Sequence, residues 1–401
     1  MRTVWTFHSA SQIVFGQNAV GHIGEIATRL KAKKALIVTD TILEKAGLLE
    51  RVRQPLVAAG LNVAAFTGGE PEPSMKAGIA CYEMAKSFQP EVLVGLGGGS
   101  NMDLAKLAAV LLKHGGTPRD YVGDDKIPGP IFPLISIPTT AGTGSEVSAA
   151  TVVTDTENHI KVGILSNYLR SAAAVVDPLM TLSCPPKVTA DSGIDALTHA
   201  IEAYTAVDNA DFPLPEGERT VYQGKHPMGD MCAEKAITLV GKYLRRAVKD
   251  GKDIEAREGM ALAAILAGLA FSNVGVALVH AMEYPVGGAV HCSHGAGNGL
   301  LLPYVMRFNV SAKVKAFADI ATLLGENVAG LSERAAADRA IAAVERLRND
   351  IGVPQRLRDI GVRPEQLRAL AEKAVGIKRI LRVNPRSVSV DEVEAIFKEA
   401  Y

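Results

Sequence analysis

Residues 91–106 read EVLVGLGGGSNMDLAK, and this stretch decides the fold class of the first half of the chain. A short apolar run ends in successive glycines, and a helix-forming segment follows at once. A buried strand, a glycine turn and a helix in this order are typical of an open sheet of parallel strands. Glycines let backbone N–H groups approach a phosphate, and the start of a helix adds partial positive charge. A tight turn without a ligand is the alternative, because the pattern is not the usual GxGxxG.

The strand–helix pattern continues on both sides of this stretch. Further buried strands are predicted at ALIVTD (35–40), LNVAAF (61–66), PLISIPTT (133–140) and AAAVVDP (172–178), with helices at 41–60 and 76–89. The alternation predicts a Rossmann-like, dinucleotide-binding α/β domain over residues 1–185, with a parallel sheet covered on both faces.

The composition changes after Pro185. Segments rich in alanine and leucine follow, and they predict an all-helical domain over residues 186–401. Residues 207–230 are rich in Pro, Gly and Asp, which predicts a long loop.

Composition also excludes several classes of function. Lys+Arg and Asp+Glu are both 43, so no net charge draws the chain to nucleic acid or to anionic lipid. The four cysteines form no CxxC pair, which argues against a disulfide framework. The apolar segment 261–279 contains Ser272 and Asn273 and is expected to be a buried helix rather than a membrane span. The N-terminus lacks a signal-peptide pattern, and we expect a cytoplasmic protein.

Two more features at strand ends favour a dinucleotide. Asp40 ends a predicted strand, where a carboxylate can bind a ribose 2′-hydroxyl and repel a 2′-phosphate, so NAD is expected rather than NADP. The loop SIPTTAGTGSEVS (136–148) is dense in glycine and hydroxyl groups. The residues expected at the cofactor from these patterns are Asp40, Gly97, Gly98, Gly99, Ser100, Asp103, Thr143 and Ser145.

A metal site is predicted in the second domain. Asp195 and His199 are four residues apart on an expected helix, so they share one face. His280 is expected to end the buried apolar helix, and His294 follows a PVGG sequence that predicts a turn. One carboxylate and three imidazoles suit Fe²⁺ or, alternatively, Zn²⁺. His291 lies nearby and is a group that supports a metal ligand, a proton carrier or a surface residue.

The chain resembles the iron-containing alcohol dehydrogenase family over nearly its whole length. The resemblance is carried by GGGSNMDLAK (97–106), IPTTAGTGSEV (137–147), DALTHAIEAY (195–204) and HAMEYPVGG…HGAGNGLLLPYVMRFN (280–309). It implies an active site between a dinucleotide-binding domain and a helical domain. It also implies metal ligation by Asp195, His199, His280 and His294, and NAD contacts by Asp40, Gly98–Ser100, Thr139, Thr140 and Lys161. By the same analogy the chain is expected to be a homo-oligomer, such as a dimer.

The chain departs from the family pattern in three places. Tyr284 stands where many members have a second histidine, so Tyr284, Glu283 or His291 is expected to relay the proton, unless the relay runs through water. Glu72 stands where the family usually has an amide. The long 207–230 loop carries Arg219, Lys225 and His226, which are either solvated or contact an anionic substrate.

The resulting expectation is metal-assisted hydride transfer between NAD(H) and a small alcohol or aldehyde. The alternatives are a glycerol dehydrogenase-like or maleylacetate reductase-like enzyme and a lyase related to dehydroquinate synthase. A catalytically silent nucleotide- or metal-binding subunit is the alternative outside the enzymes.

Overall fold

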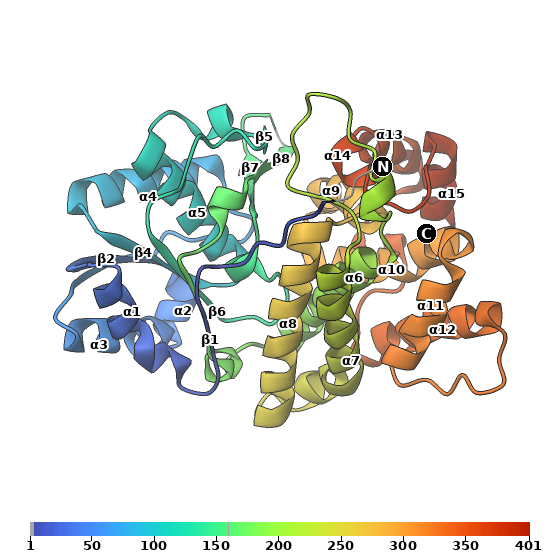
Figure 1. Cartoon of the computed structure of the whole chain (residues 1–401), viewed down its shortest axis with the longest axis horizontal. Coiled ribbons are helices and arrows are strands. Elements are labelled where there is room, and N and C mark those ends of the chain that lie inside the picture. The colour runs from blue at the N-terminus through green and yellow to red at the C-terminus, as the bar shows by residue number, and fades with distance from the viewer. Residues whose placement is uncertain (1–3, 159) are drawn as a thin grey trace. The chain divides into compact units, whose positions relative to one another are not determined.

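The computed structural model describes residues 4–158 and 160–401, which form two compact units (Figure 1). The sheet unit comprises residues 8–184, apart from residue 159, together with residues 219–221. The helical unit comprises residues 4–7, 185–218 and 222–401. The first described residues therefore belong to the helical unit, although they precede the sheet unit in the sequence.

The main sheet of the sheet unit is parallel throughout. Within the described residues it has six strands in the order β1-β9-β6-β4-β2-β3. Their bounds are β1 Ile13–Phe15, β2 Lys34–Val38, β3 Asn62–Phe66, β4 Val92–Gly97, β6 Leu134–Pro138 and β9 Ala173–Val176. All but β1 were predicted, and the parallel sheet confirms the fold class.

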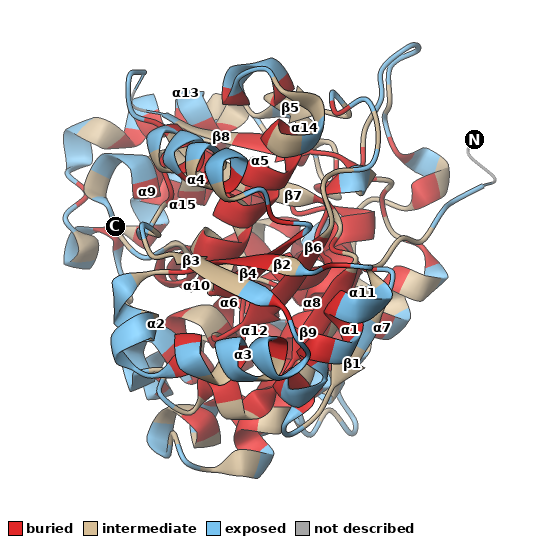
Figure 2. Cartoon of the chain, turned by 90° about the vertical axis from the view of Figure 1, so that its left-hand side faces the viewer, coloured by how far each residue is buried: buried red, intermediate tan, exposed pale blue. Residues whose placement is uncertain are grey.

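Helices cover both faces of this sheet. They are α1 Ile23–Arg29, α2 Thr41–Lys45, α3 Leu48–Ala58, α4 Met75–Phe88 and α5 Gly99–His114. Alternate strand residues point to opposite faces: Ile37 packs with α1 and α3, whereas Leu36 and Val38 pack with α4 and α5. The central strands β4 and β6 are buried along their whole length, as Figure 2 shows. The predicted helix at 41–60 is two helices, because Gly47 adopts a φ of 78° between them.

A second, smaller sheet lies in the same unit and was not predicted. It consists of β5 Gly123–Asp124, β8 Ile160–Leu165 and β7 Ala150–Asp155, in that order. Strands β7 and β8 are antiparallel, and β7 continues directly from the hydroxyl-rich loop that follows β6.

The helical unit is built from ten α-helices among the described residues. They are α6 Pro186–Thr205, α7 Pro227–Lys249, α8 Ile254–Val274, α9 Leu278–Val290, α10 His294–Asn309, α11 Val314–Leu323, α12 Glu333–Asp350, α13 Leu367–Val375, α14 Lys378–Leu381 and α15 Val390–Ala400. The predicted 207–230 loop is shorter than expected, because it contains a 3-10 turn, η6 Asn209–Asp211, and ends where α7 begins.

The apolar segment at 261–279 is divided between two helices. Gly275 has a φ of 125°, and the axes of α8 and α9 differ by 103° across this break. No single helix in the described part of the chain is long and apolar enough to cross a membrane; only this bent pair passes when its helices are taken together. His280 therefore lies in the first turns of α9 instead of ending α8, and the PVGG sequence at 285–288 is helical instead of a turn. Both of these local predictions were wrong.

Candidate metal centre and cofactor loops

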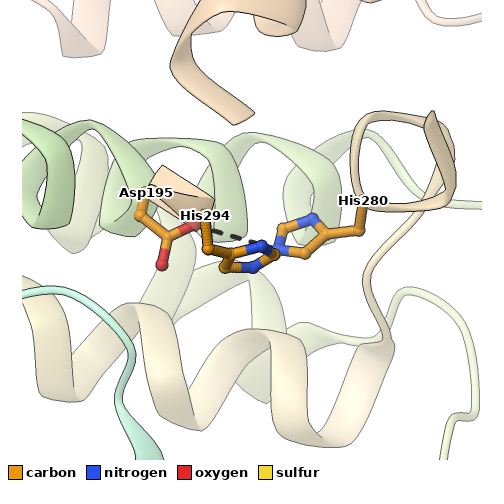
Figure 3. A group of neighbouring side chains, drawn as sticks. All are labelled: Asp195, His280 and His294. Atoms are coloured by element: carbon orange, nitrogen blue, oxygen red, sulfur yellow. Dashed lines mark ion pairs between the residues drawn. The ribbon is translucent and has the colours of Figure 1, made fainter. Parts of the chain in front are cut away.

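Three of the four predicted metal ligands converge in the helical unit (Figure 3). Asp195 comes from α6, His280 from α9 and His294 from α10, and their donor atoms all lie within 4.8 Å of one another. We call these three residues the ligand group. Asp195 and His280 are buried, and His294 is half-buried.

His199 lies next to the ligand group. Its ring stacks on that of His280 with 4.8 Å between centroids, and on Phe271 at 4.2 Å. The Nδ1 atom of His199 is 3.9 Å from Oδ2 of Asp195. The four-residue spacing of Asp195 and His199 thus places both on one face of α6, as predicted, but His199 is not part of the three-residue group.

Small residues bring the helices of the ligand group together. Gly295 and Gly299 of α10 face α6, and a Cβ on Gly295 would lie 2.0 Å from the carbonyl oxygen of Asp191. A Cβ on Gly299 would lie 2.6 Å from a side-chain carbon of Ile194. Because any larger side chain would separate the helices, these glycines permit the approach of His294 to Asp195.

Two buried carboxylates support the imidazoles of the ligand group. Oε2 of Glu202, on α6, accepts a hydrogen bond of 2.6 Å from Nδ1 of His280. Oε2 of Glu283, on α9, accepts from Nδ1 of His294. When Nδ1 carries the proton, Nε2 keeps its lone pair and can accept a metal ion. The Nε2 atoms of His280 and His294 both face Asn298, and that of His280 is also near Asp195.

The contacts of Asn298 test whether a cation fits. Its Nδ2 lies 2.8 Å from Oδ1 of Asp195 and 3.1 Å from Nε2 of both His280 and His294. One amide group has two hydrogens, so it cannot satisfy three acceptors that point to one place. A divalent cation bound to these three acceptors would satisfy all of them, and the donor set therefore fits a metal.

The electrostatics of Asp195 agree with this fit. Burial by itself raises the pKa of the Asp195 carboxyl, but His199, His294 and His280 together bring it below its usual value. The group is therefore an ionised carboxylate in a buried place. Such a charge is stabilised when a cation is bound directly beside it.

The three residues predicted to relay a proton occupy different surroundings. Tyr284 is half-buried, with its ring centroid 5.9 Å from that of His294 and 6.4 Å from that of His280. Burial raises the pKa of Tyr284 to about 12, so its hydroxyl is protonated at neutral pH. Glu283 is fully buried against His294. His291 is exposed at the end of α9, in the left-handed conformation with a φ of 52°.

The predicted phosphate cradle is a group of close contacts at the start of α5. Gly97 has a φ of 148°, and a Cβ there would lie 2.3 Å from Nδ2 of Asn101, so only glycine fits. A Cβ on Gly99 would lie 2.9 Å from a side-chain carbon of Thr143, and one on Gly98 would be 3.5 Å from Oγ1 of Thr140. The N-terminus of this 16-residue helix has no side-chain cap, so its N–H groups can bind an anion.

Asp40 is held firmly at the end of β2. Its Oδ1 caps α2 by accepting from the backbone N–H groups of Ile42 and Leu43 at 2.8 and 2.9 Å. Its Oδ2 accepts from Nδ2 of Asn101 at 2.7 Å. These bonds leave acceptor capacity on the carboxylate for a ribose hydroxyl.

Asp103 and Ser145 bond to each other rather than standing open to a ligand. Oγ of Ser145 donates to Oδ1 of Asp103 at 2.7 Å, and Oδ2 of Asp103 accepts from the amide of Val152 at 2.8 Å. The fully buried Lys106 donates to Oγ of Ser145 at 3.0 Å and to Oγ of Ser148 at 2.9 Å. These residues fix the loop after β6. Thr139, in this loop, is buried and donates its amide hydrogen to the carbonyl of Gly97, whereas Ser100 is half-buried.

Two of the departures from the family pattern involve charged residues, Glu72 and those of the 207–230 segment, and these residues have defined partners. Nζ of Lys161, on β8, lies 2.5 Å from Oε1 of Glu72. The three charged residues of the 207–230 segment are also engaged: Arg219 pairs with Asp125, Lys225 pairs with Asp230, and His226 is buried and caps α7. His226 is therefore not available to an anionic substrate.

The chain matches two family models. A family model described as iron-containing alcohol dehydrogenase matches residues 10–178, and one described as its C-terminal domain matches residues 218–401. The chain belongs to the iron-containing alcohol dehydrogenase family. It is an oxidoreductase of the alcohol dehydrogenase type.

Individual members of the family are similar over their full length. An NAD-dependent methanol dehydrogenase of Bacillus methanolicus is 39% identical, with 96% of this chain and 97% of that protein covered. A 1,3-propanediol dehydrogenase of Klebsiella pneumoniae is 40% identical, with 96% of each chain covered. A solved structure of a 1,3-propanediol oxidoreductase superimposes with a TM-score of 0.93 at 38% identity, covering 99% of this chain and 100% of the other.

Sequence reasoning missed three residues of the site. Glu202 and Asn298 support the ligand group, and Lys106 fixes the loop after β6. The signal for two of them was present. Glu202 is seven residues after Asp195, and Asn298 is four after His294, so each shares a helix face with a predicted ligand.

Proposed function

We propose that this dehydrogenase transfers a hydride between NAD(H) and a small alcohol or aldehyde, with a metal bound by Asp195, His199, His280 and His294. Fe²⁺ is the expected ion and Zn²⁺ the alternative, because both accept carboxylate and imidazole ligands. The observation that carries the proposal is the convergence of Asp195, His280 and His294 within 4.8 Å. The printed names of the relatives, which include methanol and 1,3-propanediol dehydrogenases, support a short alcohol as substrate.

The cofactor site that we propose lies in the sheet unit. The open N-terminus of α5 and the glycines before it provide N–H groups for the pyrophosphate, with Ser100, Thr139, Thr140 and Thr143 beside them. Asp40 accepts from the adenosine ribose and disfavours a 2′-phosphate. Lys161 carries a positive charge that Glu72 holds in place, and Asp103 and Ser145 shape the loop.

The proposed chemistry uses residues of the helical unit. A divalent ion in the ligand group supplies Lewis-acid polarisation of the substrate oxygen. Glu202 and Glu283 keep Nε2 of His280 and His294 available as ligand atoms. When an aldehyde is reduced, the hydride of NADH goes to the carbonyl carbon and a proton goes to its oxygen. We assign the transfer of that proton to the hydroxyl of Tyr284, which is protonated at neutral pH and regains its proton from water. His291 stays an alternative carrier at the surface end of α9.

We further propose that the domain over 1–185 carries the cofactor, that the domain over 186–401 carries the metal, and that the enzyme is a cytoplasmic homo-oligomer. No disulfide joins the four cysteines, all of which lie in the described residues, and this agrees with a reducing compartment.

The first experiment measures metal content and turnover together. Protein purified without oxygen is analysed for metals, and NADH oxidation with short aldehydes is followed before and after chelation. We expect about one iron or zinc per chain and a rate that chelation removes. His280→Ala and His294→Ala should lose the metal and the activity while NADH still binds. His22→Ala, an exposed histidine of the sheet unit, is the matched control. Full turnover without metal would instead indicate a metal-free, maleylacetate reductase-like enzyme.

A further inference from the structure

Glu283 differs from the other carboxylates around the ligand group. It is fully buried on α9, three residues after His280, and its Oε2 lies against Nδ1 of His294. Within the described residues no hydrogen-bond donor reaches its other oxygen, Oε1. Gly297 of α10 packs so closely against it that a Cβ there would lie 2.8 Å from Cγ of Glu283. The side chain is therefore held in one place with a half-satisfied carboxylate.

Glu283 differs from Glu202 in the donors that reach its carboxylate. Glu202 also binds a ligand imidazole, but its two oxygens accept hydrogen bonds of 2.7 and 2.9 Å from the backbone N–H groups of Val279 and Ala277. Those bonds stabilise its charge whether or not a metal is present. Glu283 has no such backbone donors in the described structure, and its ion-pair partner is His294.

We infer that Glu283 is a positioning residue whose charge stabilises the bound metal at the expense of the metal-free protein. Its hydrogen bond fixes the ring of His294 so that Nε2 points toward Asp195 and His280. A buried carboxylate with a single imidazole partner is costly in the empty site. A cation bound to that imidazole lowers this cost, because positive charge then lies within one ring of the carboxylate. The inference rests on the proposed metal site and replaces the expected proton-relay role of Glu283.

The inference predicts that Glu283→Gln weakens metal binding without lowering the unfolding temperature of the metal-free protein. Glutamine keeps an oxygen that can accept from His294, but it removes the buried charge. We expect the dissociation constant for Zn²⁺ or Co²⁺, measured by competition with a coloured chelator on the full-length chain, to rise about tenfold. The metal-free variant should unfold at the same temperature as the metal-free parent or at a higher one. A purely structural role would lower that temperature.

Two further variants complete the test. Glu283→Ala removes the hydrogen bond as well as the charge, and we expect its dissociation constant to rise up to about 100-fold, with an altered visible absorption of bound Co²⁺. Glu365→Gln, an exposed carboxylate of the same unit, should change neither quantity. If Glu283→Ala does not fold, Glu283→Gln alone decides.

The outcomes separate this inference from the proposed function. A parent protein that binds no Zn²⁺ or Co²⁺ with its histidines intact would overturn both. A parent that binds one ion per chain, with Glu283→Gln binding it equally tightly, would overturn only the role of Glu283. A metal-free Glu283→Gln protein that unfolds at a lower temperature than the parent would also contradict it.

Discussion

At the scale of single residues, Asp40 combines two tasks in one carboxylate. It caps α2 through Oδ1 and bonds Asn101 through Oδ2. Asn101 is itself buried and also donates to the carbonyl of Leu96. The negative charge at the end of β2 is thus held rigidly in the place where a parallel sheet of this kind binds a ribose.

Asp40→Ser should relax the preference for NAD over NADP. Serine keeps an oxygen that caps the helix but carries no charge to repel a 2′-phosphate. Two charges about 4 Å apart near a surface interact by roughly 4 kcal/mol, so the ratio of kcat/KM for NADP to that for NAD should rise roughly tenfold or more. Asn101→Ala, which leaves the charge in place, should change the ratio less. An unchanged ratio in Asp40→Ser would remove Asp40 from cofactor selection.

Glu146 is the residue expected to give the fold a distinctive pH dependence. It is buried in the loop after β6, within η3 Ser145–Val147, and burial raises its pKa to about 7. Nearby Lys106 opposes that rise, and burial lowers the pKa of Lys106 to about 8, with Asp103 and Glu146 opposing the shift.

The sign of the effect follows from proton binding. Between pH 4.5 and about 7 the folded state keeps a proton on Glu146 that the unfolded chain has lost. The stabilising contribution of this proton to the free energy of unfolding is therefore fully present below pH 4.5 and is lost as the pH rises to about 7.

Glu146→Gln should remove this dependence. Relative to the parent, the variant should gain stability between pH 5 and 7.5, by roughly 1–3 kcal/mol. Thermal unfolding midpoints at several pH values measure the gain, with the exposed Glu44→Gln as control. A constant difference between variant and parent across this range would contradict the prediction.

At the scale of elements, the proposed metal site depends on how closely α10 approaches α6. Gly295→Ala would place a Cβ 2.0 Å from the carbonyl oxygen of Asp191, which is backbone and cannot swing aside. The helices must separate, and we expect a loss of roughly 1–3 kcal/mol in the free energy of unfolding. Because His294 precedes Gly295, metal affinity should fall as well.

Gly288→Ala is the matched control for this prediction. Gly288 lies in α9, and nothing is within 4 Å of the position that its Cβ would take. Alanine favours a helix over glycine, so this variant should be as stable as the parent or up to about 1 kcal/mol more stable. If both alanine variants retained metal affinity and stability equally, close packing of α6 and α10 would not be what forms the site.

At the scale of the whole molecule, the residues that we assign to the cofactor and to the metal belong to different units. Asp40 and the start of α5 lie in the sheet unit, and the ligand group lies in the helical unit. Loss of the metal and loss of nucleotide binding are therefore separable, and the histidine variants proposed above should show the first without the second.

Local patterns in the sequence predicted some of these features, but not the contacts between different elements. Apolar runs such as 92–97 identify buried strands directly, and a four-residue spacing places Asp195 and His199 on one helix face. The break between α8 and α9 at Gly275 was not predicted, because the apolar composition continues through it into α9. The β7–β8 pair, a local hairpin, was also not predicted, because residues 156–159 between its strands contain none of the glycine pairs that usually indicate a hairpin. Local periodicity likewise cannot reveal that Glu283 of α9 meets His294 of α10.

The chain contains a single tryptophan, Trp5, and it lies in the short amino-terminal arm that belongs to the helical unit. Its ring stacks on His226, the cap of α7, with 4.7 Å between centroids and 5° between planes. Indole emission responds to its immediate neighbours, and a protonated imidazole quenches it. Burial lowers the pKa of His226, so this quenching should set in at a lower pH than for an exposed histidine. Tryptophan fluorescence thus reports the docking of this arm on the cap of α7, and it carries no signal from the sheet unit, which contains no tryptophan.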